Sequence, residues 1–148
     1  MLGMKCAECM FAFPFVSQSF MERPLIIGIV GPCASGKTTL RAELLKYGYE
    51  VKHIAQEHSY VADMWKRLTN PEILIYLDVS YSNTIKRCKL NWTIEEFEVQ
   101  VMRLLHARRN ADFYLNTDDL TPEQVRNCVI EYISARQNTN NSHKENNS

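Results

Sequence analysis

Residues 31–38 read Gly31-Pro32-Cys33-Ala34-Ser35-Gly36-Lys37-Thr38. This stretch fits the phosphate-binding pattern G-x-x-x-x-G-K-[ST]. Its two glycines permit backbone angles and a close approach that a side chain would block, so successive N–H groups can turn toward phosphate oxygens. Lys37 is expected to place its charge on the β and γ phosphates, and Thr38 to offer its hydroxyl to Mg²⁺. The stretch therefore predicts a loop that holds a nucleoside triphosphate, with ATP and Mg²⁺ as the expected cofactors.

The residues on both sides of this loop have the patterns that it requires. Residues 25–30 form a short apolar run typical of a buried parallel strand, and residues 39–46 have the apolar spacing of a helix. A helix that begins near Lys37 would direct the positive end of its dipole at the same anion. The residues expected to bind the nucleotide are Gly31, Cys33, Ala34, Ser35, Gly36, Lys37, Thr38 and Thr39.

Length and charge limit the number of domains and the partners. The chain has 148 residues, of which 45% are hydrophobic, enough for one core. Lys and Arg number 17, as do Asp and Glu, so the net charge is zero and no overall field attracts nucleic acid or an anionic membrane. No apolar run approaches the ~20 residues of a membrane span. We therefore expect a cytoplasmic protein whose partners are a nucleoside triphosphate and a small phosphate acceptor.

The cysteines indicate a reducing compartment. Their number, five, is odd, and they lack the spacing of a disulfide scaffold. Cys6 and Cys9 form one C-x-x-C, but a zinc site there would need two further ligands. Cys33 lies within the glycine-rich stretch, where any small residue suffices. A metal or redox function of Cys6 and Cys9 remains the alternative to their having no chemical role.

The chain divides into three parts. Residues 1–20 carry a short apolar patch without a signal cleavage site and are expected to be an appendage, with Met21 as a candidate native start. Residues 21–135 form the predicted folded domain. Residues 136–148 are polar throughout, which predicts a disordered tail.

Strand and helix patterns alternate within residues 21–135. After the first strand and helix, strands are predicted at residues 49–54, 73–77 and 113–115, and helices at 59–68, 82–89, 93–109 and from Thr121 onward. Thr93 with Glu96 forms a capping-box pattern, and Thr121 precedes a proline at the first helical position. Such alternation predicts an α/β fold: a three-layer α/β/α P-loop NTPase fold with a small, mostly parallel sheet of about four strands.

Three segments resemble the small P-loop metabolite and nucleoside kinases, with shikimate and gluconate kinases nearest in pattern. They are residues 31–39, residues 73–80 leading to Arg87, and residues 111–125. In those kinases an A-D, hydrophobic, T-D, L-[ST]-P-E-[EQ]-V run like the third segment lies beside the adenine pocket. The resemblance therefore implies ATP-dependent phosphoryl transfer and a nucleobase site beside residues 111–125.

The departures from that family affect the acceptor. Shikimate kinases carry a D-x-D after the second strand and a Gly-rich strand end, whereas this chain continues Ala55-Gln56-Glu57-His58 and has no glycine after Gly48. One strand and helix of the usual five-stranded core are missing. Shikimate itself is therefore not expected as the acceptor.

Two carboxylates compete for the metal and the acceptor. Asp78 follows the apolar strand 73–77 as a Walker B aspartate does, and with Thr38 it forms the predicted metal site. Glu57 follows the second strand, where related kinases place the carboxylate that binds or deprotonates the acceptor hydroxyl. The alternative interpretation of Glu57 is a solvated residue in the first turn of the next helix.

Charge on the transferred phosphoryl group needs a further cation. Arg87, Arg103, Arg108 and Arg109 lie where a lid is expected, and Arg103 joins Lys37 and Glu57 as a predicted catalytic residue. Two functions remain open. The first is a Mg²⁺-dependent kinase for a small molecule or nucleotide, and the second is a nucleotide-binding protein without transferase activity.

Overall fold

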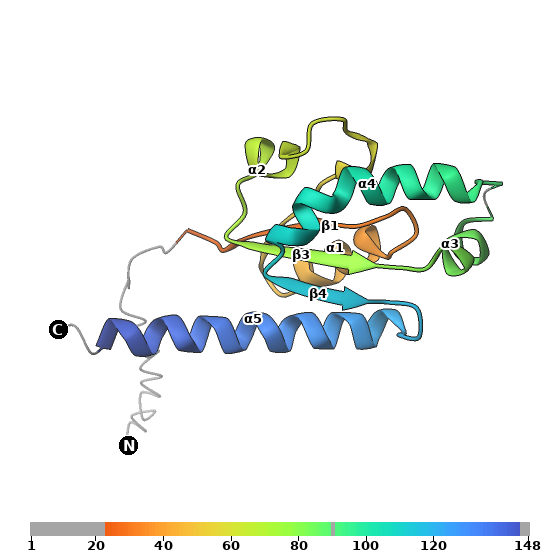
Figure 1. Ribbon diagram of the computed structural model, residues 1–148. Coiled ribbons are helices and arrows are strands. Elements are labelled where there is room, and N and C mark those ends of the chain that lie inside the picture. Colours follow the sequence, from red (N-terminus) through yellow and green to blue (C-terminus); the bar gives the residue numbers. More distant parts are fainter. Residues whose placement is uncertain (1–22, 90, 146–148) are drawn as a thin grey trace, which may run out of the picture.

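The computed structural model describes residues 23–89 and 91–145 and shows an α/β fold around one parallel sheet (Figure 1). Four strands, in the spatial order β2-β1-β3-β4, make up the sheet within these residues. The strands are β1 (Ile26–Val30), β2 (Glu50–His53), β3 (Ile73–Asp78) and β4 (Phe113–Asn116). Every neighbouring pair is parallel, and Ile27 pairs with Val51 on one side and Ile73 on the other. The predictions of an α/β class and a parallel sheet of about four strands are confirmed.

In the described part of the chain, five α-helices and one short 3-10 helix connect and flank the strands. They are α1 (Lys37–Lys46), η1 (Gln56–His58), α2 (Met64–Leu68), α3 (Tyr81–Cys88), α4 (Ile94–Asn110) and α5 (Pro122–Glu145). Helices α1 and α5 cover one face of the sheet, α2 and α4 lie on the other, and α3 lies beyond the carboxyl end of β3 (Figure 1). This arrangement is compatible with three layers.

Strand β3 contributes side chains to both halves of the core because successive side chains point to opposite faces of the sheet. Ile73, Ile75 and Leu77 pack into the cluster that holds Leu40 and Leu44 of α1. Leu74 and Tyr76 pack with Leu104 and Ala107 of α4. A strand buried on both sides reads as a continuous apolar run, which is why residues 73–77 were readable from the sequence.

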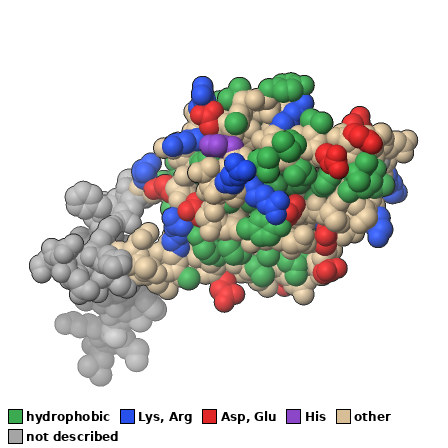
Figure 2. Space-filling view, viewed as in Figure 1, with side chains coloured by type: hydrophobic (Ala, Val, Ile, Leu, Met, Phe, Trp, Pro, Cys, Tyr) green, Lys and Arg blue, Asp and Glu red, His purple; other side chains and the backbone are tan. Residues whose placement is uncertain are grey.

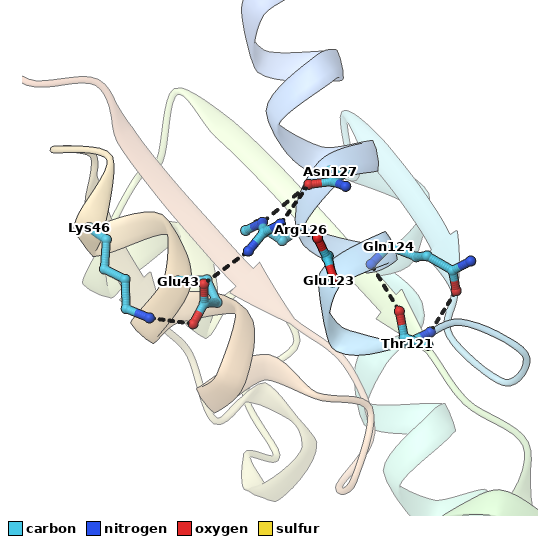
Figure 3. A network of polar contacts seen from close by, with 7 residues as sticks. All are labelled: Glu43, Lys46, Thr121, Glu123, Gln124, Arg126 and Asn127. Carbon is cyan, nitrogen blue, oxygen red and sulfur yellow. Dashed lines mark hydrogen bonds and ion pairs between the residues drawn. The ribbon is translucent and has the colours of Figure 1, made fainter.

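Two helix starts are fixed by reciprocal side-chain caps. Thr93 accepts from the Glu96 N–H while Glu96 accepts from the Thr93 N–H, which confirms the predicted capping box. Thr121 and Gln124 form the same exchange at the start of α5 (Figure 3). In the same network Arg126 lies 3.4 Å from Glu43, an ion pair that joins α5 to α1.

The helix predicted over residues 59–68 is shorter in the structure. The fully buried Gln56 accepts from the Trp65 N–H and donates to the Val61 carbonyl. The side chain thus takes up backbone groups that a continuous helix would pair internally. As a result the chain winds around Gln56, and regular helix exists only from Met64 to Leu68.

Helix α5 extends beyond the predicted domain boundary at Ala135. Residues 136–145, which the sequence assigns to a disordered tail, continue the helix to Glu145. Arg136 donates to the Tyr132 hydroxyl and forms a 2.9 Å ion pair with Asp112, which fixes the next turn. Adding turns to an existing helix is easier than starting one, so polar residues suffice there. Residues 1–22 and 146–148 lie outside the described residues, as do the predictions made for them.

The face that carries α4 mixes charges of both signs. Blue basic and red acidic side chains are interspersed with hydrophobic ones over this face (Figure 2). The exposed hydrophobic side chains of α4 include Val99 and Met102. None of the helices in the described part of the chain is long and apolar enough to cross a membrane.

Candidate functional site

The site lies where the order of the strands reverses. From β1 the chain moves to β2 on one side and then back across to β3 on the other, so the loops after β1 and β2 diverge at the carboxyl edge. Open parallel sheets bind ligands in the crevice at such a point. Residues 31–36, here called the 31–36 loop, leave β1 there, and the η1 turn Gln56–His58 follows β2 beside it.

The backbone of the 31–36 loop turns sharply into α1. Gly36, with φ +96°, precedes the first helical residue, and Ala34 has φ +64°, which is unusual for a residue with a side chain. No side chain of the described residues caps α1, and its first turn holds no acidic residue. The first N–H groups of a helix lack intrahelical partners, so this uncapped start exposes donors and the positive end of the helix dipole.

Lys37 is the first residue of α1 and is almost completely buried, with 5% of its surface exposed. Its Nζ donates to the carbonyl oxygens of Gly31 (2.7 Å) and Pro32 (2.8 Å). It also lies 2.8 Å from Glu57 Oε1. The ammonium group is therefore held between the loop and η1, facing backbone carbonyls and one carboxylate.

Glu57 is as buried as its partner. Only 3% of it is exposed, and its second oxygen, Oε2, has no hydrogen-bond partner among the described residues. The prediction placed Glu57 after the second strand, and the structure shows it in η1, paired with Lys37. The alternative of a solvated carboxylate is wrong, because the side chain turns into the sheet edge.

Cys33 contacts the same turn from the loop side. Its Sγ lies 3.6 Å from His58 Nε2 and 3.9 Å from Glu57 Oε1. Burial and then the Glu57 charge raise the pKa of the Cys33 thiol. Its backbone N–H donates to Gln100 of α4 over 3.1 Å, so α4 also fixes the loop. The thiol is thus protonated at neutral pH and faces acid and imidazole groups.

A cavity of about 810 Å³ opens over the loop. Of the residues expected to bind the nucleotide, those from Cys33 to Thr39 line it, and Gly31 does not. A Cβ on Gly31 would lie 2.1 Å from the Leu77 carbonyl oxygen, so this glycine allows β1 and β3 to approach. Glu57 is the one carboxylate among the residues that line the cavity.

The far end of the cavity is built by Arg87 and the start of α5. Arg87 donates to the Ala34 carbonyl over 3.1 Å and to the Thr117 hydroxyl over 3.0 Å. Leu120, Pro122 and Trp92 also line the cavity. One guanidinium group therefore connects the 31–36 loop to the β4–α5 turn.

His53, at the end of β2, also lines the cavity. Burial and then the Lys37 charge lower the pKa of its imidazole. The histidine is therefore neutral at pH 7 and adds no charge to the cavity. Sequence patterns did not single out His53, which shares the parity of Val51 in the predicted strand.

The structure does not bring the two predicted metal ligands together. Asp78 continues the alternation of Leu74 and Tyr76, which places its side chain on the α4 face of the sheet, away from α1 and Thr38. There it accepts from the Tyr114 hydroxyl and lies 3.6 Å from Arg108. Asp78 does not line the cavity. The carboxylate that accompanies the loop is Glu57.

Arg103 also lies outside the cavity lining. It donates to the Glu57 carbonyl over 3.3 Å, and its guanidinium carbon lies 4.3 Å from the centre of the Tyr60 ring. Its position supports the backbone of η1 rather than a ligand. Arg87 occupies the cavity in its place. From the sequence, four arginines are candidates for a lid. Which of them faces the cavity depends on how each helix is rotated about its axis, and packing decides that rotation.

Comparison with known proteins identifies a fold but no family. No family model matches the chain, and no curated protein matches it. Solved structures do match, among them an uncharacterized protein from Eubacterium ventriosum with a TM-score of 0.54 and 11% identity. The match covers 74% of this chain and 98% of that one. At this identity the likeness concerns the fold alone.

Proposed function

We propose that this chain binds a nucleoside triphosphate with Mg²⁺ along the 31–36 loop and transfers its γ-phosphoryl group to a small acceptor. The observation that supports this most directly is the buried Lys37 at the uncapped start of α1, on the wall of an 810 Å³ cavity. Helix starts with a nearby ammonium group are suited to phosphate. The resemblance of residues 31–39 to the P-loop kinases agrees with it.

Lys37 would exchange its present partners for the ligand. In the structure its Nζ donates to two backbone carbonyls and pairs with Glu57. Phosphate oxygens are stronger acceptors for an ammonium group than carbonyls are. Binding would draw Nζ toward the cavity and free Glu57 to hold the hydration shell of a Mg²⁺ beside the Thr38 hydroxyl. Glu57 thereby replaces Asp78 in the proposed metal site.

The nucleobase is proposed to lie at the end formed by Arg87 and Pro122. Both line the cavity, as do Leu120 and Val125, which supply apolar surface. A guanidinium plane and a proline ring can contact the two faces of a base. This agrees with the expectation from residues 111–125, and it leaves the choice between adenine and guanine open to measurement.

Calorimetry with Mg²⁺ and ATP tests the binding. Replacing Lys37 by Ala removes a charge-assisted contact of about 1.5–3 kcal/mol, so the Kd should rise roughly ten-fold or more. Lys46→Ala is the matched control, because Lys46 ends the same helix with its side chain 66% exposed and outside the cavity. Equal affinities for the two variants and the wild type contradict the proposal.

A second function, nucleotide binding without phosphoryl transfer, is favoured by the position of Arg103. That predicted catalytic cation contacts Tyr60 and the backbone of Glu57 instead of the cavity. A screen of small hydroxyl and phosphate acceptors with γ-labelled ATP separates the two functions. Label in an acceptor shows a kinase, whereas phosphate released equally in every reaction shows a slow NTPase.

A further inference from the structure

Three metal-binding side chains of different chemistry meet at the edge of the cavity. Cys33 comes from the 31–36 loop, and Glu57 and His58 come from η1. One ligand atom from each lies within 4.8 Å of the other two. From the sequence, Cys33 is expected only as a small residue, and the proposed nucleotide site uses neither its sulfur nor His58, although it shares Glu57.

The spacing of these atoms is close to that of a zinc site. Cys33 Sγ lies 3.6 Å from His58 Nε2, and Glu57 Oε1 lies 3.9 Å from each of them. A tetrahedral Zn²⁺ with bonds of ~2.3 Å to sulfur and ~2.0 Å to nitrogen or oxygen holds its ligands roughly 3.3–3.5 Å apart. Shifts of a few tenths of an ångström, within the freedom of the half-buried Cys33 and exposed His58, would close the difference.

A second observation concerns the other oxygen of the Glu57 carboxylate. Glu57 is only 3% exposed, and its buried Oε2 accepts no hydrogen bond from the described residues. Burying a carboxylate oxygen without a donor is costly. Lys37 satisfies Oε1 only. The distances to Cys33 Sγ and His58 Nε2 are those of Oε1, so the carboxylate would turn about its terminal torsion, which is broad, to present Oε2 to a cation there.

We propose that Cys33 Sγ, the Glu57 carboxylate and His58 Nε2 form a Zn²⁺ site, with water in the fourth position facing the cavity. Thiolate and imidazole ligands select Zn²⁺ over Mg²⁺, which prefers oxygen ligands alone. Binding breaks the Cys33 S–H bond, forms the S–Zn bond and releases the proton to the buffer, with no change of oxidation state. Thiolate and carboxylate offset most of the charge that Lys37 and the ion bring together.

The pair of Cys33 and His58 is less suited to nucleophilic catalysis. A nucleophilic cysteine requires a thiol whose pKa is depressed by neighbouring positive charge. Here burial and the Glu57 carboxylate raise the pKa of the Cys33 thiol. A bound cation reverses that balance, because a coordinated thiol loses its proton.

The test measures Zn²⁺ binding by the full chain with a non-thiol reductant and without nucleotide, so that it is separate from the test of ATP binding. The double variant Cys6→Ser/Cys9→Ser removes the C-x-x-C of the amino-terminal segment and serves as the background. This variant should bind one Zn²⁺ at micromolar metal and release a proton. Co²⁺ in its place should give thiolate-to-metal absorption and the visible bands of a tetrahedral ion.

Cys33→Ser and His58→Ala in that background should each weaken Zn²⁺ binding by roughly 100-fold. Losing a residue that only supports a metal ligand costs up to about 100-fold, and losing a ligand itself should cost at least as much. Cys33→Ser should also abolish the thiolate-to-Co²⁺ absorption. Cys88→Ser, which removes an exposed cysteine, should change neither. The proposal is overturned if the background variant binds no Zn²⁺, or if Cys33→Ser and His58→Ala bind it as tightly as the background does. Both ligands are partly exposed, and unchanged melting curves would show that the variants fold.

Discussion

Lys37 Nζ and Glu57 Oε1 lie 2.8 Å apart with at most 5% of either residue exposed, and this ion pair joins α1 to the turn after β2. It is the buried ion pair at the centre of the candidate site. Breaking a buried pair leaves one charge without compensation, whereas replacing both partners removes the problem. The double substitution is therefore expected to cost less than the two single substitutions together.

Glu57→Gln and Lys37→Met should each lower the free energy of unfolding by about 2–4 kcal/mol, because each leaves the other charge buried and unpaired. The double variant should lose clearly less than the sum of the two. Urea unfolding of all four proteins gives the coupling energy, which we expect to exceed about 1 kcal/mol. The pair of Lys46 and the half-buried Glu43 is the control, with a clearly smaller coupling, because the Lys46 side chain is 66% exposed. Additive losses at Lys37 and Glu57 would contradict the prediction.

Replacing each of the two glycines of the 31–36 loop by alanine should lower the free energy of unfolding by different amounts. A Cβ on Gly31 would meet the Leu77 carbonyl oxygen at 2.1 Å, so β1 and β3 would have to move apart. On Gly36 no atom lies within 4 Å, and only the φ of +96° opposes a side chain. We expect Gly31→Ala to cost about 3 kcal/mol or more and Gly36→Ala roughly 1–2 kcal/mol. Equal losses in thermal unfolding would show that packing against β3 is not what requires Gly31.

Local patterns were sufficient to predict most of the elements. The order of strand, glycine-rich loop and helix over residues 25–46, and the caps at Thr93 and Thr121, depend on contacts between residues close in sequence. Such contacts follow from composition and spacing. The sheet was predictable as parallel because helices separate its strands.

Side-chain direction was not predictable, since it depends on which helix covers which face. Asp78 shares the parity of Leu74 and Tyr76, but only the packing of α1 on the opposite face shows that it points away from Thr38. Cys33 and His58 are 25 residues apart and meet because β2 pairs with β1. The buried Gln56 stops a helix by side-chain bonds that no local pattern reveals.

Arg87 should contribute to stability as well as to ligand binding. It donates to Ala34 of the loop and to Thr117 after β4, so it ties two segments that are far apart in sequence. Lysine keeps the charge but loses the planar fork. We expect Arg87→Lys to lower stability by about 1–2 kcal/mol and to weaken ATP binding. Lys86→Ala, one residue earlier and exposed, should change neither quantity in melting and calorimetry.

The end of α5 should stabilise the domain. Arg136 pairs with Asp112 at 2.9 Å and donates to the Tyr132 hydroxyl, although 39% of its side chain is exposed. Exposed pairs of this kind contribute up to about 1 kcal/mol. A chain that ends at Ala135 should therefore unfold at lower urea than one that ends at Glu145, and Arg136→Ala in the full chain should reproduce most of the difference. Identical midpoints would show that residues 136–145 contribute nothing.

In metal-free protein, alkylation of Cys33 should require a higher pH than that of an ordinary cysteine. Burial disfavours the thiolate, and the Glu57 carboxylate near Sγ adds repulsion, so both raise the pKa of the thiol. Only the thiolate reacts with iodoacetamide, so the midpoint of the rate against pH should lie above the ordinary value of about 8.5. Glu57→Gln removes the repulsion and should move the midpoint to lower pH. Cys88, whose thiol is exposed, is the internal control for the activity of the reagent and the folding of the variant. Peptide mass spectrometry resolves the two sites. A midpoint at or below the ordinary value, or one that rises in Glu57→Gln, would show that Glu57 does not act on the Cys33 sulfur as its 3.9 Å contact requires.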